Sequence, residues 1–436
     1  MNKRKTFTEY LAIISIFSIF LDQALRGVLP FDLYYYYPVF ILFLITQLLQ
    51  TGKIAILPSW FMIGLGVIFA GSVFITWFKN ILGFELLKQV FGLVFTSLVY
   101  YNVLFVLKFD VKRIFNYYLV FAFWVALHGV IDNILHYVGI HLTKVNLAGP
   151  GLYREYGIMG EPFYLALALT PAIVYYLCYF KLTWKSKKLV FLVTSGCYLL
   201  TYSSIAVTGF VLGIFMSLYI NNYFSAQRGK IILAPLLITP VILLTSYLVN
   251  NIGLINARFY DTTSLFLSSQ IKADEAGKSN ASTFALYTNY AIARDSFLES
   301  PLLGSGLGSH PIIYETTFLK YFPPRYLTMY GNQNQQDANS KFLRLMSETG
   351  LVGLILFFIA FIRFFASKRK MVSEELKNLG AINYAIFVYI VLCLIRNGNY
   401  INVGFFFFFF LYYVSWYNIQ KGNIKSPRVK HSTAQV

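Results

Sequence analysis

Apolar windows of about 20 residues recur along this 436-residue chain. Each window is long enough to cross the hydrocarbon core of a bilayer as a helix. Only 12% of the residues are charged, whereas an ordinary soluble domain has about 25%. The sequence therefore predicts an all-α polytopic membrane protein rather than a soluble domain.

The windows predict twelve transmembrane helices, at residues 9–28, 33–50, 57–78, 83–107, 114–139, 163–180, 189–204, 205–221, 231–250, 350–366, 380–396 and 401–418. The first window contains an apolar run, Leu11–Leu21, that could pass for the core of a signal peptide. No convincing small-residue cleavage site follows it, so we interpret it as a retained span. The unbroken run Leu189–Ile220 is too long for one crossing, and we interpret it as two.

Basic residues lie in short runs between the windows and give the chain a formal net charge of +18. With the N-terminus inside, every predicted cytoplasmic connection is basic, as the positive-inside rule expects. The charge therefore indicates membrane topology rather than nucleic-acid binding, and both termini are predicted to be cytoplasmic. The predicted division is nine spans in residues 1–250, a large periplasmic loop in 251–349, three spans in 350–418 and a cytoplasmic tail in 419–436.

The predicted periplasmic loop contains two helix patterns separated by a glycine-rich turn. The first pattern can be capped by Asn280 or Ser282 and ends at Pro301. Residues on one face at helical spacing are Phe284, Tyr287, Ala291, Arg294 and Leu298. Gly304, Gly306 and Gly308 then allow a tight turn with its backbone exposed to a ligand. The second pattern, Asp337 to Gly350, is predicted to run straight into a membrane span.

Sequence motifs that bind nucleotides or metals are missing. There is no GxxxxGK[ST], no HExxH and no CxxC, so we expect no metal and no cofactor. The GxGxG at Gly304–Gly308 lacks the preceding strand and following helix of a dinucleotide fold. His128, Asp132 and His136 share one face of the fifth predicted span, where they favour a polar cavity wall, or packed polar groups, over a metal site.

Three blocks of sequence resemble the O-antigen ligase and polymerase superfamily: YREYGIMGEPFYLALAL (Tyr153–Leu169), ARDSFLESPLLGSGLGS (Ala293–Ser309) and DANSKFLRLMSETGLVGLILF (Asp337–Phe357). Members of this family are polytopic enzymes that transfer glycans from undecaprenyl pyrophosphate. The resemblance implies a GT-C-like, multi-pass fold in the bacterial inner membrane. It also implies an undecaprenyl-pyrophosphate-linked donor and acceptor as substrates, with a chain-length regulator and a flippase as candidate partners.

Two departures from the family pattern favour a polymerase (the Wzy type) over a ligase. Ligases carry a histidine, proposed to activate the acceptor, where this chain has Asn339. The span that often carries a Ser–Arg pair reads TYSSIAVTGFVLG, with Ser203 and Ser204 but no arginine. A polymerase joins lipid-linked repeat units. The alternatives are a ligase that transfers glycan to lipid A-core and a polysaccharide flippase, and the single large motif-bearing loop argues against the flippase.

Glycan transfer needs a group that stabilises the departing pyrophosphate and a base that activates a sugar hydroxyl. Arg154, at a span entrance, is the candidate for the first role. Asp337 and Glu161 are the candidate bases, with helix-start carboxylates as the structural alternative. The predicted substrate-binding residues are Arg258, Arg294, Gly304, Gly306, Gly308, Asn339, Arg344 and Glu348. At i,i+4 spacing, Asp337–Lys341 and Arg344–Glu348 are also expected to form ion pairs.

Aromatic residues form two clusters with more than one interpretation. Tyr34–Tyr37 predicts an interfacial aromatic belt, with a sugar-stacking platform as the alternative. Phe405–Phe410 predicts a lipid-facing or packed helix rather than a dedicated lipid groove. Glu85 and Lys88, in the fourth predicted span, are expected to pair internally.

Overall fold

The computed structural model describes residues 6–21, 34, 36–79, 83–143, 145–149, 151–222, 265–266, 271–331 and 333–425. Within these ranges the chain is helical apart from one short antiparallel hairpin, β1 (Leu147–Gly149) with β2 (Leu152–Tyr153). The predicted all-α fold is confirmed.

Helices occupy eleven of the twelve predicted spans: α1 (Phe7–Phe17, continued by η1, Ser18–Phe20), α2 (Tyr37–Thr51), α3 (Ser59–Phe78), α4 (Phe84–Val106), α5 (Val111–Tyr137), α6 (Pro162–Cys178), α8 (Lys188–Leu200), α9 (Ser204–Ile220), α16 (Lys341–Arg363), α17 (Glu374–Arg396) and α18 (Phe405–Lys425). The remaining predicted span, at 231–250, lies outside the described residues. Among the described residues, five helices, α3, α4, α5, α16 and α17, are long and apolar enough to cross a membrane. Together they make a multi-pass membrane protein.

Two predicted boundaries lie at or near breaks in the helices. Helix α6 is followed by α7 (Phe180–Ser186), which is bent by 96° relative to it, so the chain turns away at the end of the predicted span 163–180. The run Leu189–Ile220 does form two helices, but they separate around Tyr202, before the predicted boundary at 204. Tyr202 has a φ of 45°, a left-handed conformation that a helix cannot continue through.

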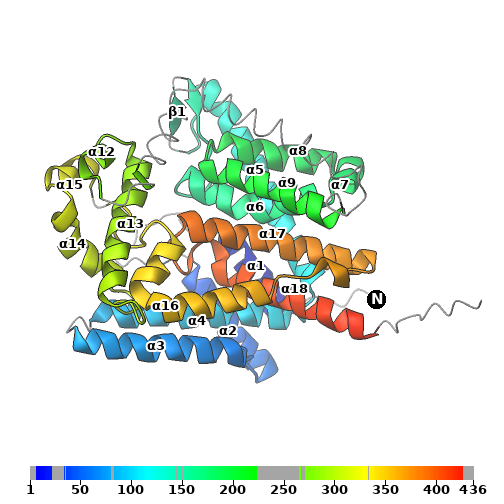
Figure 1. Ribbon diagram of the computed structural model, residues 1–436. Helices are drawn as coiled ribbons and strands as arrows, with labels where there is room; N and C mark the ends of the chain where they lie inside the picture. Colours follow the sequence, from blue (N-terminus) through cyan, green and yellow to red (C-terminus); the bar gives the residue numbers. More distant parts are fainter. Residues whose placement is uncertain are drawn as a thin grey trace, which may run out of the picture.

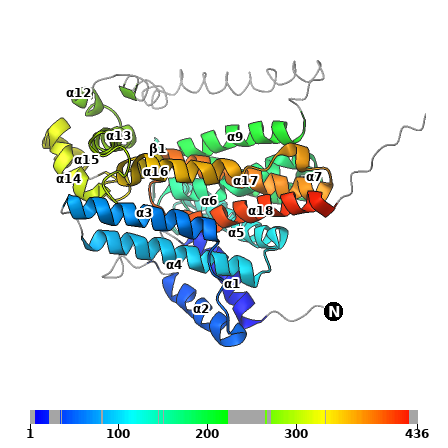
Figure 2. The ribbon, with the colours of Figure 1, turned by 60° about the horizontal axis from the view of Figure 1, so that its bottom comes forward.

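A small helical cap lies at one end of the bundle (Figure 1, Figure 2). It consists of α12 (Ala273–Ala276), α13 (Ala281–Glu299), α14 (His310–Tyr321) and α15 (Arg325–Tyr330). Asn280 caps α13 by accepting the backbone N–H of Thr283 at 3.1 Å, as predicted. Phe284 and Tyr287 are buried in the cap's own apolar core, whereas Leu298 is 64% exposed, so the predicted face ends before it.

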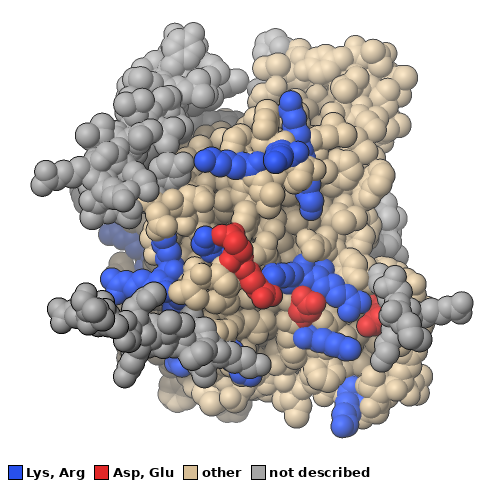
Figure 3. Space-filling view, turned by 90° about the vertical axis from the view of Figure 1, so that its right-hand side faces the viewer, with Lys and Arg blue, Asp and Glu red and all other residues tan. Residues whose placement is uncertain are grey.

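Lysine and arginine side chains gather at the opposite end of the bundle (Figure 3). This end carries α7, with the run KLTWKSKK at 181–188, and the connection between α16 and α17, with SKRK at 367–370. The cap and the basic end therefore lie at opposite ends of the helices, which is the arrangement that the predicted topology requires.

Helix α17 lies at the centre of the bundle and packs against α6, α9 and α18. The phenylalanine run at the start of α18 is buried: Phe407, Phe408 and Phe410 have no exposed surface. Phe408 contacts Tyr118 of α5 and Tyr389 of α17 through ring pairs 5.1 Å and 4.5 Å apart. For Phe407, Phe408 and Phe410 the predicted packed helix is confirmed, whereas Phe405, Phe406 and Phe409 line a cavity.

Helix α16 is interrupted at Gly350, whose φ of 58° and ψ of −153° are not helical. The 301–306 segment satisfies the backbone groups that this break leaves open. Carbonyls of Pro301 and Leu302 accept the N–H groups of Leu351 and Val352, at 2.8 Å and 3.0 Å, and the Ser305 and Gly306 N–H groups donate to the carbonyls of Ser347 and Glu348. An unpaired backbone group at membrane depth costs several kcal/mol, so the break is built together with this segment.

This junction corrects two predictions. The second loop helix does not run straight into a span, because Gly350 breaks it. Gly304, Gly306 and Gly308 do have positive φ angles and form the predicted tight turn, but they are buried rather than exposed. A Cβ on Gly304 would lie 2.6 Å from the Thr349 nitrogen, so the glycine is needed for close backbone packing.

Candidate functional site

The chain enters α16 through a strained turn. Ala338 and Asn339 both have left-handed backbones, with φ of 58° and 59°. This conformation costs a non-glycine residue about 1–2 kcal/mol, and such costs concentrate at functional sites. Asp337 stabilises the turn because its Oδ1 accepts the backbone N–H of Asn339 at 3.0 Å and Nδ2 of Asn334 at 3.2 Å. The helix itself begins at Lys341 with Ser340 as its cap, so the predicted start at Asp337 is wrong.

The loop before α18, residues 397–402, packs onto this turn. A Cβ on Gly398 would overlap the Asp337 carbonyl, so only glycine lets the two backbones approach this closely. Ser340 Oγ donates to the Leu394 carbonyl at 2.6 Å, which fixes the turn to the end of α17. Two segments far apart in the sequence therefore form one wall.

Arg344 and Glu348 form a buried ion pair in the first half of α16. Nε of Arg344 lies 3.0 Å from Oε1 of Glu348, and the two side chains are 5% and 0% exposed. Arg344 Nη2 also donates to Oε1 of Gln89 in α4 at 2.8 Å. The predicted i,i+4 pair is confirmed, but it is not an ordinary surface pair. Removing one partner from a buried pair typically costs about 3–5 kcal/mol, so this guanidinium is held firmly in place.

Tyr400 lies between the two cations of this helix. The Arg344 guanidinium carbon is 4.5 Å from the centre of the Tyr400 ring, and Lys341 Nζ is 5.5 Å from it. Lys341 also donates to the Asn399 carbonyl, so its predicted pair with Asp337 is replaced by contacts with the 397–402 loop. Burial and the Glu348 carboxylate raise the pKa of Tyr400, which keeps its hydroxyl protonated. We call Lys341, Arg344, Glu348 and Tyr400 the Arg344 centre.

His310 joins the Arg344 centre to the cap. It is fully buried, and burial together with the Arg344 charge lowers its pKa to about 3, so it is neutral. Its Nε2 lies 2.9 Å from Oδ1 of Asn289, which can only accept, and its Nδ1 lies 3.0 Å from Ser347 Oγ. The proton is therefore on Nε2. His310 connects α13, α14 and α16 and fixes the first half of α16 against the cap.

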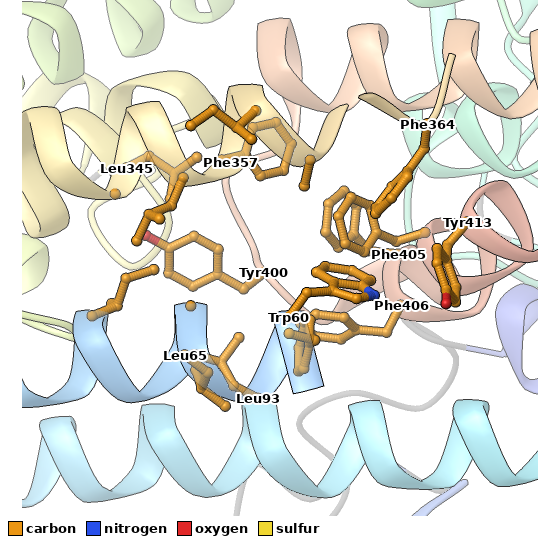
Figure 4. Close-up of a pocket in the computed structure, with 18 of the residues that line it drawn as sticks. Trp60, Leu65, Leu93, Leu345, Phe357, Phe364, Tyr400, Phe405, Phe406 and Tyr413 are labelled. Atoms are coloured by element: carbon orange, nitrogen blue, oxygen red, sulfur yellow. The ribbon is translucent and has the colours of Figure 1, made fainter. Parts of the chain in front are cut away.

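A cavity of about 520 Å³ opens on one side of the Arg344 centre. Figure 4 shows Leu345 and Phe357 of α16 on one side of it, Leu65 of α3 and Leu93 of α4 opposite, and Tyr400 between them. Its lining is apolar and aromatic and extends along α16 from Lys341 to Arg363. The lining therefore follows α16 on both sides of its break at Gly350. We call this space the apolar cavity.

A second cavity, of about 640 Å³, lies on the other side of the centre. Arg344 lines it, together with Glu85 and Gln89 of α4, Asn399, and the rings of Tyr34 and Tyr37. Since Tyr400 lines the apolar cavity and Arg344 lines the second one, a wall of two stacked side chains separates them. We call this space the mixed cavity.

The predicted residues Arg154 and Glu161 lie elsewhere, in residues 151–161, which we call the Arg154 segment. Arg154 is half-buried, and its Nε donates to the Thr201 carbonyl at the α8–α9 break, 3.3 Å away. Glu161 is exposed and occupies the N-cap position of α6 without capping it through its side chain. Between them Glu155 is buried, and desolvation raises its pKa to about 7. The structure thus divides the predicted catalytic residues between two places.

Of the remaining predicted residues, Asn339 and Glu348 lie at the Arg344 centre or next to it. Arg294 is half-buried on α13, and Arg258 lies outside the described residues. The sequence reasoning missed the roles of His310, Tyr400 and Gln89. Two signals were present: His310 directly follows the glycine turn, and the polar run NGNYIN (397–402) interrupts two apolar windows.

Two of the polar residues of α5, Asp132 and His136, contact the segment that follows the helix. Asp132 is buried and accepts the Thr143 hydroxyl, and His136 Nδ1 lies 2.8 Å from His141 Nδ1. Of the predicted alternatives, these contacts support packed polar groups. In the part of the chain that the structure describes, no three His, Cys, Asp or Glu residues are grouped so that they could hold a metal ion.

Comparison with protein families gives a match over part of the chain. Residues 189–358 match the family model described as O-antigen ligase. No curated protein matches the chain. The matched range contains the cap, the glycine turn, the strained turn and the first half of α16, and so it contains Lys341, Arg344 and Glu348 of the Arg344 centre. The match does not distinguish a polymerase from a ligase, but it supports a relation of residues 189–358 to the O-antigen ligase and polymerase superfamily, membrane enzymes of polysaccharide synthesis.

Proposed function

We propose that this protein polymerises oligosaccharide repeat units carried on undecaprenyl pyrophosphate, at the periplasmic face of the bacterial inner membrane. The observation that carries the proposal is the apolar cavity, which begins at Lys341 and Tyr400 and follows α16 across the membrane-spanning part of the bundle. A long isoprenoid chain needs such an apolar surface. Its pyrophosphate needs cations. Lys341 lines the polar end of this cavity, and Arg344 lies against Tyr400 at the wall between the two cavities.

In the proposed reaction a hydroxyl of the acceptor sugar attacks the anomeric carbon of the donor glycan. A C–O bond forms there as the bond to the pyrophosphate oxygen breaks, and undecaprenyl pyrophosphate leaves with both electrons of that bond. Arg344 is placed to stabilise the charge on the leaving group, because Glu348 and Gln89 hold its guanidinium rigidly. The hydroxyl proton passes to a carboxylate base.

Asp337 is our candidate for that base. Its carboxylate is half-buried in the strained turn, directly after Gln336, which lines the mixed cavity. It is also close enough to Arg344 to interact with it electrostatically. A base in this place could take a proton from a hydroxyl in the mixed cavity while the leaving group departs on the other side of Arg344.

A polymerase fits position 339 better than a ligase does. Ligases of the family that the chain resembles carry a histidine there, proposed to activate the acceptor, whereas Asn339 has no useful basicity and adopts a left-handed φ that asparagine tolerates well. Its side chain is 6% exposed, and in the described part of the chain its Nδ2 has no hydrogen-bond acceptor. A substrate oxygen would satisfy this donor, which supports a binding role rather than a catalytic one.

The apolar cavity can be tested by filling it. Gly64 and Gly66 both lie on α3 with open space where a Cβ would be, but only Gly64 lines the cavity. Purified full-length protein supplied with lipid-linked repeat units should make a polymer ladder. We expect Gly64→Phe to lower the rate at least about tenfold by excluding the lipid, and Gly66→Phe to leave it close to that of the wild type.

The products identify the reaction. A ladder made by the wild type and by Gly66→Phe, and reduced in Gly64→Phe, is the expected result. Equal ladders from all three proteins would remove the apolar cavity from the reaction. Transfer of finished glycan to lipid A-core, with no ladder from lipid-linked units alone, would make the protein a ligase.

A further inference from the structure

The mixed cavity has a composition that the apolar cavity lacks. Its walls combine the rings of Tyr34, Tyr37 and Phe84 with a carboxylate, an ammonium group and amides. Its volume of about 640 Å³ falls within the roughly 300–1,000 Å³ range of small-ligand sites. An aliphatic lipid would leave these polar groups without partners, so the cavity suits a ligand that has both apolar faces and many hydroxyls.

The tyrosines form a fixed aromatic wall. The Tyr34 ring stacks on Tyr36 with centres 5.1 Å apart and meets Tyr37 edge-on at 5.5 Å. The Tyr34 hydroxyl donates to Asn402 Oδ1 at 2.9 Å, which ties it to the loop before α18. Tyr37 is held in turn by an edge-on contact with Phe95, with ring centres 5.4 Å apart. Because this platform is already ordered, it loses little conformational entropy when it binds the face of a sugar ring.

Polar groups face this wall from the start of α4. Glu85 and Lys88 pair at 3.5 Å and keep 40% and 51% of their side chains exposed, so they can also reach a ligand. Gln89 stands one residue further and bonds Arg344. Because Glu85 and Lys88 line a cavity instead of bonding only each other inside a span, the predicted internal pair is only partly correct.

We propose that the mixed cavity is a carbohydrate subsite that holds the sugar of the acceptor repeat unit. Pyranose rings have C–H faces that pack on aromatic rings and hydroxyls that bond carboxylates, ammonium groups and amides. The inference rests on the proposed function, because that function supplies a glycan acceptor. Under this proposal Tyr34 and Tyr37 belong to a sugar platform rather than to an interfacial belt.

The acceptor is favoured over the donor by the position of the cavity. The lipid of the donor lies on the Tyr400 side of the wall, so its pyrophosphate leaves toward that side. The attacking hydroxyl must approach the anomeric carbon from a direction that the leaving group does not occupy. The mixed cavity, on the Arg344 side, provides that direction.

The test fills the mixed cavity without disturbing any core. Leu87 lines it and is 64% exposed, whereas Leu298, also 64% exposed, is on α13 and lines neither cavity. The probe is the lipid-free oligosaccharide released by mild acid from the strain's own lipid-linked repeat units. Binding to purified full-length protein is measured by saturation-transfer NMR for the wild type, Leu87→Trp, Phe84→Ala and Leu298→Trp.

We expect Leu87→Trp to weaken binding about tenfold or more, Phe84→Ala to weaken it less, and Leu298→Trp to bind like the wild type. Binding by Leu87→Trp that equals that of Leu298→Trp would overturn the subsite. In turnover with both lipid-linked substrates, Phe84→Ala should raise the half-saturating concentration of the acceptor only. An increase for the donor instead would overturn the assignment to the acceptor.

The binding result is independent of polymerisation. If the wild type makes no polymer but Leu87→Trp still abolishes oligosaccharide binding, the proposed function fails and the carbohydrate subsite stands. If the wild type makes polymer and Leu87→Trp binds the oligosaccharide normally, the function stands and the subsite fails.

Discussion

The Arg344 centre and the Arg154 segment both offer an arginine and a carboxylate at the end of the bundle that carries the cap. They differ in how these groups are held. Arg344 is buried, paired with Glu348 and placed between two cavities. Arg154 is half-buried and donates to a backbone carbonyl, and Glu161 is exposed. This difference is why we place the proposed reaction at Arg344, a buried charge with cavities on both sides, rather than at Arg154, an arginine at a span entrance.

Substitution of the carboxylates should give the largest difference in polymerisation rate between the two regions. Asp337→Asn keeps the acceptor for the Asn339 N–H but removes the base, and a general base contributes about 10²–10⁴ in rate. Glu161→Gln should change the polymerisation rate by less than about threefold. Rates are measured on purified protein of equal thermal stability. A large loss in Glu161→Gln with normal activity in Asp337→Asn would move the reaction to the Arg154 segment.

Substitution of the arginines should give the second-largest difference in polymerisation rate. Arg344→Lys keeps the charge but cannot contact Glu348, Gln89 and a phosphate with one planar group, so we expect a rate loss of about 10²–10³. Arg154→Lys can still donate to the Thr201 carbonyl and should keep activity within about tenfold. Steady-state polymerisation rates of the two variants on the same lipid-linked substrate test this prediction. Equal losses in the two variants would show that both arginines contact the leaving group.

Backbone substitutions compare the two regions without changing any charge. Gly350 and Gly151 both have positive φ, 58° and 70°, so alanine strains each of them. At Gly350 a Cβ would also lie 2.5 Å from the Gly304 nitrogen, whereas at Gly151 it would meet nothing within 4 Å. Gly350→Ala should therefore destabilise the protein by about 2–3 kcal/mol more than Gly151→Ala, measured by denaturant unfolding. Equal destabilisation by the two substitutions would mean that the backbone at the α16 break can rearrange at little cost in unfolding free energy.

The pH dependence of stability should have opposite signs in the two regions. His310 has a pKa lowered to about 3, so its contribution is lost as pH falls below about 6.5, where the unfolded state binds the proton. Glu155 has a pKa raised to about 7, so its contribution is present below about 4.5 and lost as pH rises through 7. Each effect should be about 1–3 kcal/mol.

Melting temperatures at pH 5 and pH 8 test this pair. Relative to the wild type, His310→Gln should be more stable at pH 5 than at pH 8, because it has no imidazole to protonate. Glu155→Gln should be relatively more stable at pH 8. A shift in the same direction for both variants would contradict the assigned environments.

The fold was predictable because it depends on patterns of whole segments. Apolar windows and the positions of lysines were enough to place the helices, and the cap of α13 followed from Asn280. Boundaries were less accurate, since Tyr202 and Gly350 break their helices through single backbone conformations that no composition window detects.

The site was only half predictable. Arg344, Glu348, Asp337 and Asn339 share one continuous motif, so sequence alone could group them. Gln89 reaches the centre from α4, 255 residues from Arg344 in the sequence, and Tyr400 reaches it from the loop before α18. His310 looked like one more loop residue until its burial and its two partners made its role clear. Such contacts depend on how helices pack, which periodicity does not determine.

The most direct test of the central claim is to locate the donor lipid. A polyprenyl pyrophosphate with a photoreactive group in its isoprenoid chain is irradiated with the full-length protein, and the labelled peptides are identified by mass spectrometry. We predict labels on Ser59–Phe78, Lys341–Arg363 and Phe405–Lys425, the helices around the apolar cavity, and loss of these labels in Gly64→Phe. Labels confined to Val111–Tyr137 and Pro162–Cys178, beside the Arg154 segment, would contradict the account.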